Sequence, residues 1–355
     1  MMKLWFSLLL WMAGFQKKLK RLRRNTRQDP HKMIMQHMLM PMNFQLVYVC
    51  ARLGIADELH HGPLSGSELA EKIGADADTL YRLLRGLVML EVLTEEPDGR
   101  FGLTSAGERL STEHHASLRG QVIIEGDLAR AWFDLLPAIQ SGENPFRSCY
   151  GESVFDHFAR DPLTAQAFNQ NFSGKGILNS LLVSYLDVGD ARTIVDVGGG
   201  YGDLLREALK MSPKASGILL DLPHVIEGAK ANLETENRVQ CVAGNFFERV
   251  PSGGEVYLLK TILHDWSDSQ ALAILKNCRG SIQEKGRLYI IEKILPERVE
   301  EAPEIVRSDL IMLVEVGGRE RSEKEFRNLL QSAGFRLIRV LPTPLSLSIL
   351  ETVPE

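Results

Sequence analysis

The sequence predicts a two-part α/β protein, in which a mostly parallel sheet follows a smaller, mainly helical domain. Two patterns predict this fold class: strand-like and helix-like runs alternate after Gly189, and short helical patterns precede a hairpin between Asn43 and Leu110. The chain has 355 residues, which is more than a single hydrophobic core usually supports. Hydrophobic residues make up 44% and charged residues 25%, a globular balance.

The alternation after Gly189 is typical of a parallel sheet covered by helices on both faces. Helices are expected at residues 204–210, 225–233, 269–282 and 323–332. Strands are expected at residues 193–197, 216–221, 238–242, 255–260, 287–292, 335–341 and 346–351.

The smaller domain reads as a winged helix. Helical apolar spacing ends at Gly54, a second helix starts at Ser67, and a third starts at Asp78, before two short strands around residues 97–99. A winged helix can bind DNA, but the third helix offers only Arg82 and Arg85 as basic side chains among several acidic neighbours. A net charge of -5 also argues against nucleic acid, so we expect a packing or dimer-forming unit.

The first 27 residues differ from the rest. An apolar run from Leu4 to Phe15 precedes seven basic residues between Lys17 and Arg27. The order of charge is wrong for a secretory signal, and the run is too short to span a membrane. It could lie in a membrane interface or pack on a partner subunit. We therefore expect a cytoplasmic protein, with membrane association left open; the four cysteines lack zinc-ligand spacing, and no metal site is expected.

A glycine-rich turn carries the strongest chemical signal. Gly198, Gly200 and Gly202 follow a buried-type strand and precede a helix, so a ligand can approach the backbone there. Their spacing is not that of a dinucleotide fingerprint, and no phosphate-binding lysine is present. Asp221 ends the next strand, where it can bond two ribose hydroxyls. Together these features indicate an adenosine-containing ligand, and the glycine spacing favours S-adenosylmethionine.

His264 follows the fourth strand of the sheet, at the edge where ligands of open α/β sheets bind. An imidazole has a pKa near neutrality and can take a proton from a hydroxyl. Glu292 ends the next strand and Glu320 precedes a later helix, so either carboxylate could orient the ring through its other nitrogen.

From about residue 40 to its end, the chain resembles the small-molecule O-methyltransferase family that includes plant caffeate, animal acetylserotonin and bacterial antibiotic-tailoring enzymes. The matching segments, all in order, are Leu53–Asp57, Leu83–Val88, Asp196–Gly202, Asp221–Val225, Gly244–Phe247, Leu259–Trp266, Arg287–Glu292, Gly317–Ser322 and Ser332–Phe335.

The resemblance implies a Rossmann-like methyltransferase sheet of seven strands with a helical winged-helix dimerisation domain. It implies four segments: an arm (1–30), the dimerisation domain (31–115), a helical linker and substrate-pocket segment (116–188) and an S-adenosylmethionine-binding domain (189–355). It also implies a homodimer. The cofactor residues would be Asp196, Gly198, Gly200, Gly202, Asp221, Leu222, Asn245, Phe246 and Lys260.

The resemblance further implies that His264 is a general base flanked by Glu292 and Glu320, acting on a hydroxyl of a small aromatic or apolar metabolite such as a polyketide, quinone or phenol. Phe168, Phe172, Ile311 and Met312 match positions that line the acceptor pocket. The family usually has Asp at the position of Asn245, and an amide oxygen still accepts a hydrogen bond. Three alternatives stay open here: a hydroxylase or decarboxylase of the same fold, a winged-helix regulator that senses a small molecule, and a catalytically silent subunit.

Overall fold

The computed structural model describes residues 29–160, 176–233 and 236–355. Its chain divides into two compact units, Met1–Asp127 and Leu128–Glu355. The predicted Phe168 and Phe172, and the arm with its suggested membrane contact, lie outside the described residues. The four-segment division stays a prediction. Among the described helices, none combines the length and apolar character needed to cross a membrane.

The first unit has the predicted succession of helices and a hairpin. The third helix buries Leu80, Leu84 and Leu87, and the two strands pair antiparallel with Thr94 opposite Gly102. The elements are α2 (Pro30–Leu53), α3 (Ile55–Leu59), α4 (Gly66–Ile73), α5 (Ala77–Met89), β1 (Leu93–Glu95), β2 (Phe101–Leu103), η1 (Gly107–Leu110) and the start of α6 (Arg119–Phe133).

The helix starts in this unit differ from the expected ones. The N-caps are Ser65, whose hydroxyl accepts from the N–H of Glu68, and Asp76, whose carboxylate accepts from Thr79. Each lies two residues before the serine or aspartate expected to start the helix. At Ser65, the glutamate three positions on completes a capping box, since its side chain accepts from the N–H of Ser65. Helix α2 also begins far earlier than the pattern near Asn43 indicates, since Asp29 caps it and proline follows at its first position.

The second unit contains the predicted seven-stranded sheet. Its strand order is β5-β4-β3-β6-β7-β9-β8, with parallel pairing except where β9 pairs antiparallel with β7 and β8. The final strand starts at Ser348 and runs to Pro354, slightly later than expected. The strands are β3 (Thr193–Val197), β4 (Ser216–Asp221), β5 (Val239–Ala243), β6 (Val256–Lys260), β7 (Arg287–Glu292), β8 (Phe335–Pro342) and β9 (Ser348–Pro354).

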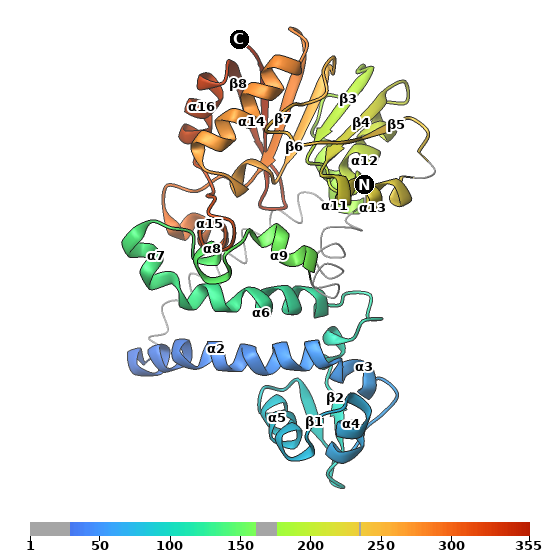
Figure 1. Ribbon diagram of the computed structural model, residues 1–355, viewed down its shortest axis with the longest axis vertical. Coiled ribbons are helices and arrows are strands. Elements are labelled where there is room, and N and C mark those ends of the chain that lie inside the picture. The colour runs from blue at the N-terminus through green and yellow to red at the C-terminus, as the bar shows by residue number, and fades with distance from the viewer. Residues whose placement is uncertain (1–28, 161–175, 234–235) are drawn as a thin grey trace, which may run out of the picture. The chain divides into compact units, whose positions relative to one another are not determined.

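Helices cover the sheet on both faces (Figure 1). Successive strand residues enter opposite cores, as the two-residue period of a strand requires. Leu288 and Ile290 of β7 pack with α14 (Asp268–Ser281) and α16 (Glu323–Ser332). Tyr289 and Ile291 pack on the other face. That face is covered by α11 (Gly176–Val183), α12 (Asp203–Met211) and α13 (Pro223–Asn232).

The remaining helices of this unit were only partly expected. The broken helical pattern before residue 160 corresponds to α7 (Leu135–Ser141), α8 (Pro145–Tyr150) and α9 (Val154–Arg160). Helix α15 (Pro303–Glu315) was not predicted. The side chain of Asn144, the N-cap of α8, donates to the carbonyls of Leu313 and Val314 at 3.1 and 3.2 Å, which ties α8 to the end of α15.

Candidate active site

The glycine turn joins β3 to α12 with three left-handed glycines. The φ angles of Gly198, Gly200 and Gly202 are 70°, 60° and 79°. A side chain at Gly200 would meet no described atom within 4 Å, so the apex of the turn faces open space. A positive φ at an open apex suits the close approach of a ligand to the backbone.

Asp221 is fixed against this turn. Its Oδ2 accepts from the N–H of Gly200 at 2.8 Å, and its Oδ1 accepts from the N–H of Leu222 at 2.7 Å. Burial raises the pKa of the Asp221 carboxyl, and the two N–H donors act in the opposite direction. The strand-end carboxylate and the glycine turn therefore form one hydrogen-bonded unit, with Leu222 beside it as the N-cap of α13.

Asp196 lies beneath the turn, within β3. Its side chain is buried, and its Oδ2 finds no hydrogen-bond partner among the residues that the structure describes. Burial raises the pKa of Asp196 to about 7, the charge of Lys260 opposes the rise, and the charge of Asp221 adds to it. A cationic ligand group would stabilise such a carboxylate.

Asn245 and Phe246 follow β5. The amide oxygen of Asn245 accepts from the N–H of Phe247 at 3.0 Å, which leaves one lone pair on that oxygen. The ring of Phe246 meets Trp266 edge to face with centroids 6.0 Å apart. Asn277 donates to the carbonyl of Phe246 at 2.8 Å, so this segment is held to α14.

His264 sits in a short 3-10 turn, η2 (Leu263–Asp265), just beyond β6. Its Nδ1 lies 3.3 Å from Oε1 of Glu320, and its Nε2 lies 3.4 Å from Oδ1 of Asp265. An ionised carboxylate only accepts hydrogen bonds, so the contact with Glu320 places the ring hydrogen on Nδ1. The neutral imidazole then has Nε2 as its proton acceptor.

The two predicted glutamates have different contacts. Oε1 of Glu292 accepts from the backbone N–H groups of Ile262, Leu263 and His264 at 3.0, 2.8 and 3.4 Å. Its Oε2 lies 3.5 Å from Nδ1 of His264 and has no hydrogen-bond partner in the described chain. Glu292 therefore anchors the turn that carries the imidazole, whereas Glu320 makes the hydrogen bond to the ring.

The surrounding carboxylates control the charge of the imidazole. Burial lowers the pKa of His264, but the charges of Glu292, Glu320 and Asp265 outweigh burial and raise it to about 10. Burial also raises the pKa of Asp265 to about 7. The donor atoms of His264, Glu292 and Glu320 lie within 4.8 Å of one another, and Lys293 Nζ lies 3.8 Å from Glu320. The chain thus supplies its own cations to balance the two glutamates.

Several residues of this centre were not predicted from the sequence. Asp265 directly follows His264, and a carboxylate next to a predicted base in the sequence indicates a candidate site residue. Arg321 is fully buried, and it donates to the carbonyls of Leu263 and Trp266 at 2.7 Å each. Ser308 and Lys293 contact Glu320 from separate elements. No local pattern marks these last three, because their partners are far away in the chain.

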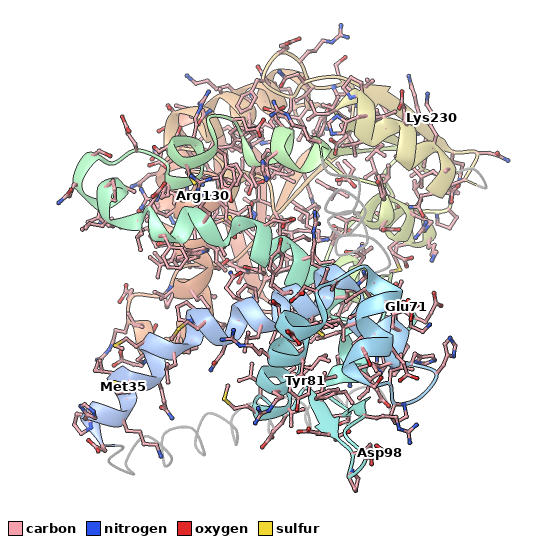
Figure 2. The ribbon with its side chains drawn as sticks, turned by 60° about the horizontal axis from the view of Figure 1, so that its bottom comes forward. Met35, Glu71, Tyr81, Asp98, Arg130 and Lys230 are labelled. Atoms are coloured by element: carbon pink, nitrogen blue, oxygen red, sulfur yellow. The ribbon has the colours of Figure 1, made fainter. Side chains whose placement is uncertain are left out.

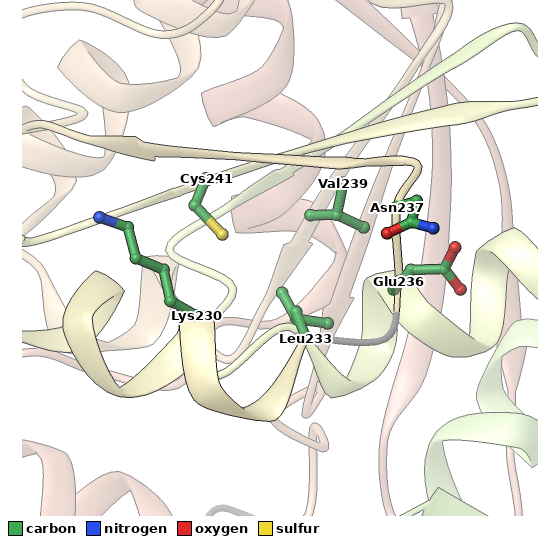
Figure 3. A pocket seen from close by; sticks show the side chains of 6 residues that line it. All are labelled: Lys230, Leu233, Glu236, Asn237, Val239 and Cys241. Atoms are coloured by element: carbon green, nitrogen blue, oxygen red, sulfur yellow. The ribbon is translucent and has the colours of Figure 1, made fainter.

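The structure places the two described residues of the predicted acceptor pocket on α15, where Ile311 and Met312 are half-buried. They follow Ser308 by three and four residues, so they share its face of the helix. An open hollow of about 350 Å³ lies elsewhere, between α13 and β5 (Figure 3). None of the predicted site residues lines it.

Comparison with known proteins identifies the family of this chain. Residues 132–336 match the O-methyltransferase domain, and residues 35–113 match the O-methyltransferase dimerisation domain. The chain belongs to the O-methyltransferase family and is an S-adenosylmethionine-dependent enzyme. The comparisons do not favour two of the alternatives: a hydroxylase or decarboxylase of the same fold, and a winged-helix regulator.

Three relatives illustrate the similarity. The phenazine O-methyltransferase PhzM of Lysobacter antibioticus is 40% identical, over 87% of this chain and 92% of its own. The 3-amino-4-hydroxybenzoate 4-O-methyltransferase of Streptomyces cremeus is 37% identical, over 85% of this chain and 84% of its own. An O-methyltransferase from neocarzinostatin biosynthesis, solved with S-adenosylmethionine and 2-hydroxy-5-methyl naphthoic acid, has a TM-score of 0.80 and 32% identity, covering 89% of this chain and 96% of that one.

Proposed function

We propose that His264 is the general base that takes the proton of the acceptor hydroxyl during methyl transfer. The contact of 3.3 Å between its Nδ1 and Glu320 carries this proposal, since in the neutral imidazole it keeps the hydrogen on Nδ1 and leaves Nε2 as the proton acceptor. The positive charge that the imidazole gains is offset by Glu320 and by Glu292, both fully or almost fully buried. A charge pair in a buried site is stronger than in water.

We propose that the turn, Asp221 and Asp196 form the core of the cofactor site. The buried Oδ2 of Asp196, to which the described residues offer no hydrogen-bond donor, suits a bound ammonium group, and the open space at Gly200 suits close approach to the backbone. Bound S-adenosylmethionine supplies a methyl group on a positively charged sulfur. That sulfur is a good leaving group, because it becomes a neutral thioether when the methyl group is transferred. The full proposed set is Asp196, Gly198, Gly200, Gly202, Asp221, Leu222, Asn245, Phe246 and Lys260.

We propose an aromatic hydroxyl compound as the acceptor. The relatives named above act on a phenazine and an aminohydroxybenzoate, and a third was solved with a naphthoic acid. Ile311 and Met312 would contribute apolar surface on the face of α15 that also carries Ser308. S-adenosylmethionine with a mass-labelled methyl group, incubated with the protein and an extract of cells that lack the gene, would reveal the acceptor by mass spectrometry.

We propose a homodimer formed through the first unit, which matches a dimerisation domain. The N-terminal part of α2 exposes seven large apolar side chains, including Met35 in Figure 2, that a partner surface would cover. Light scattering of the purified chain tests this. The exposed set is Met33, Ile34, Met35, Met38, Leu39, Met40 and Met42.

The variant His264→Ala tests the role of the base. We expect turnover to fall by about 10²–10⁴-fold, the usual contribution of general-base assistance, with the dissociation constant of S-adenosylmethionine unchanged in calorimetry. Probe acceptors are 3-amino-4-hydroxybenzoate and hydroxynaphthoic acids. A variant with wild-type turnover would remove His264 from this role.

A further inference from the structure

We propose that Lys293 and Ser308 are positioning residues that hold the Glu320 carboxylate against His264, share its negative charge with the imidazole and so set the protonation of the ring. This inference rests on the proposed function, in which His264 is the general base. Neither residue belongs to the site set that the sequence predicts.

A chain of polar contacts links the two residues to the imidazole. Nζ of Lys293, just beyond β7, donates to Oγ of Ser308 on α15 at 2.6 Å. Oγ of Ser308 donates to Oε1 of Glu320 at 2.6 Å, and the same Oε1 lies 3.3 Å from Nδ1 of His264. Two elements separated in the sequence therefore meet at one oxygen of the carboxylate.

The direction of this chain is fixed by the atoms themselves. An ammonium group donates but cannot accept, so Ser308 must accept from Lys293. Its single hydroxyl hydrogen is then available only for Glu320. A carboxylate accepts that hydrogen best when it is ionised, and hydrogen bonds to an ionised group are the stronger ones. The arrangement therefore favours the charged form of Glu320 over the protonated one.

Burial of Ser308 and Glu320 strengthens the influence of these contacts on the charge of Glu320. Ser308 is 5% exposed and Glu320 is 1% exposed, so water does little to stabilise either group. The charged or titratable groups facing Glu320 are His264 and Lys293 on the positive side, and Glu292, Asp265 and Asp309 on the negative side. Lys293 is the cation of this set that does not take part in the proposed proton transfer.

The charge of Glu320 follows from the balance of these groups. Burial raises the pKa of Glu320, but the hydrogen bond and charge of His264, the hydroxyl of Ser308 and the charge of Lys293 together lower it below its usual value. From neutral pH upward Glu320 is ionised, so these changes act on the imidazole. Without the Lys293 charge, less positive charge opposes protonation of His264. Without the Ser308 hydroxyl, the negative charge of Glu320 is shared with one donor fewer, which favours the charged form of the imidazole. Both changes therefore raise the pKa of His264.

The test is a titration of His264 in the full-length protein without substrate. Histidine labelled with ¹³C reports the charge of each imidazole by NMR from neutral pH to about pH 11.5, and His264→Gln assigns the signal. The informative variants are Lys293→Met and Ser308→Ala. The matched controls are Lys293→Arg, which keeps the charge, and Ser308→Thr, which keeps the hydroxyl.

We expect the midpoint for His264 to move up by about half a pH unit or more in Lys293→Met and Ser308→Ala, and to stay near the wild-type value in both controls. Turnover of a probe acceptor at neutral pH should fall about three- to tenfold in the first two variants, because less of the base is neutral. Lys293 is partly exposed, so its substitution leaves a folded protein even if Ser308→Ala does not.

An unchanged midpoint in Lys293→Met would overturn the proposal, even if the melting temperature falls, because a purely structural tie between β7 and α15 changes stability alone. This outcome is distinct from failure of the proposed function. If His264→Gln retains full turnover, His264 is not the base, whatever the titration shows.

Discussion

Nη1 of Arg321 donates to the carbonyl oxygen of Leu263 at 2.7 Å, across 58 residues of sequence. The same guanidinium reaches Trp266 through Nη2 and Asp268 through Nε. Arg321 thus holds both sides of the turn that carries His264, from a position next to Glu320. Two adjacent residues therefore fix the site: Glu320 contacts the imidazole of His264, and Arg321 holds the turn that carries it.

Arg321→Met should lower the free energy of unfolding by about 2–4 kcal/mol, because it leaves buried carbonyls without donors. Turnover should fall as well, since the turn is no longer fixed. Chemical denaturation measures the first effect. Arg327→Met is the matched control: Arg327 makes an exposed ion pair with Glu323, and its loss should cost no more than about 0.5 kcal/mol. Equal stability of the two variants would contradict the assigned role.

Gly318→Ala should be strongly destabilising. A Cβ at this position would lie 2.0 Å from the carbonyl oxygen of His264, so the loop would have to move away from the turn. We expect a loss of about 1–3 kcal/mol or more in thermal or chemical unfolding. At Gly280, in α14, a Cβ would meet no described atom within 4 Å. Gly280→Ala should leave stability unchanged or raise it by up to about 1 kcal/mol.

Asp221→Ala should weaken S-adenosylmethionine binding by about 100-fold, equivalent to losing roughly two hydrogen bonds to a charged group. The carboxylate also holds the N–H of Gly200, so the turn should lose order. Calorimetry measures the affinity. Lys230→Ala, at the hollow in Figure 3, is the control and should bind normally. Tight binding by Asp221→Ala would exclude this carboxylate from the cofactor site.

The rate should depend on pH through His264. Because the neighbouring carboxylates raise its pKa to about 10, the neutral base becomes more abundant as pH rises, and turnover should increase from neutral to alkaline pH. Glu320→Gln removes one negative charge, which lowers the pKa of His264 and moves the rising limb to lower pH. Initial rates with a probe acceptor, measured across the pH range, give the position of the rising limb for the wild-type protein and for Glu320→Gln. A limb that stays in place would mean that Glu320 does not influence the base.

The same substitution at Glu292 should have a different main effect. Its Oε1 holds three backbone N–H groups of the His264 turn, and Glu292→Gln keeps one oxygen for them. Glu292→Ala removes all three bonds and should reduce the free energy of unfolding by about 2–4 kcal/mol, whereas Glu292→Gln should cost less. Denaturation of both variants distinguishes anchoring of the turn from a purely electrostatic role.

Local sequence patterns determined the seven strands, the helices between them and the helical first unit. The short apolar runs of β3 and β7, and the glycine turn before α12, are features that a strand or turn shows by itself. The pattern did not reveal α15, whose buried residues are few, or the early start of α2. It also placed two helix caps two residues late.

By itself, the sequence determined which residues stand at the carboxyl ends of the strands, and so placed His264, Glu292 and Asp221 at one edge of the sheet. Only the tertiary structure decided which carboxylate bonds the imidazole and which anchors its turn, because both are glutamates and differ only in what surrounds them. It also decided that Arg321 is buried and that Lys293 and Ser308 reach Glu320. These contacts join residues from separate elements, and the packing of those elements brings them together.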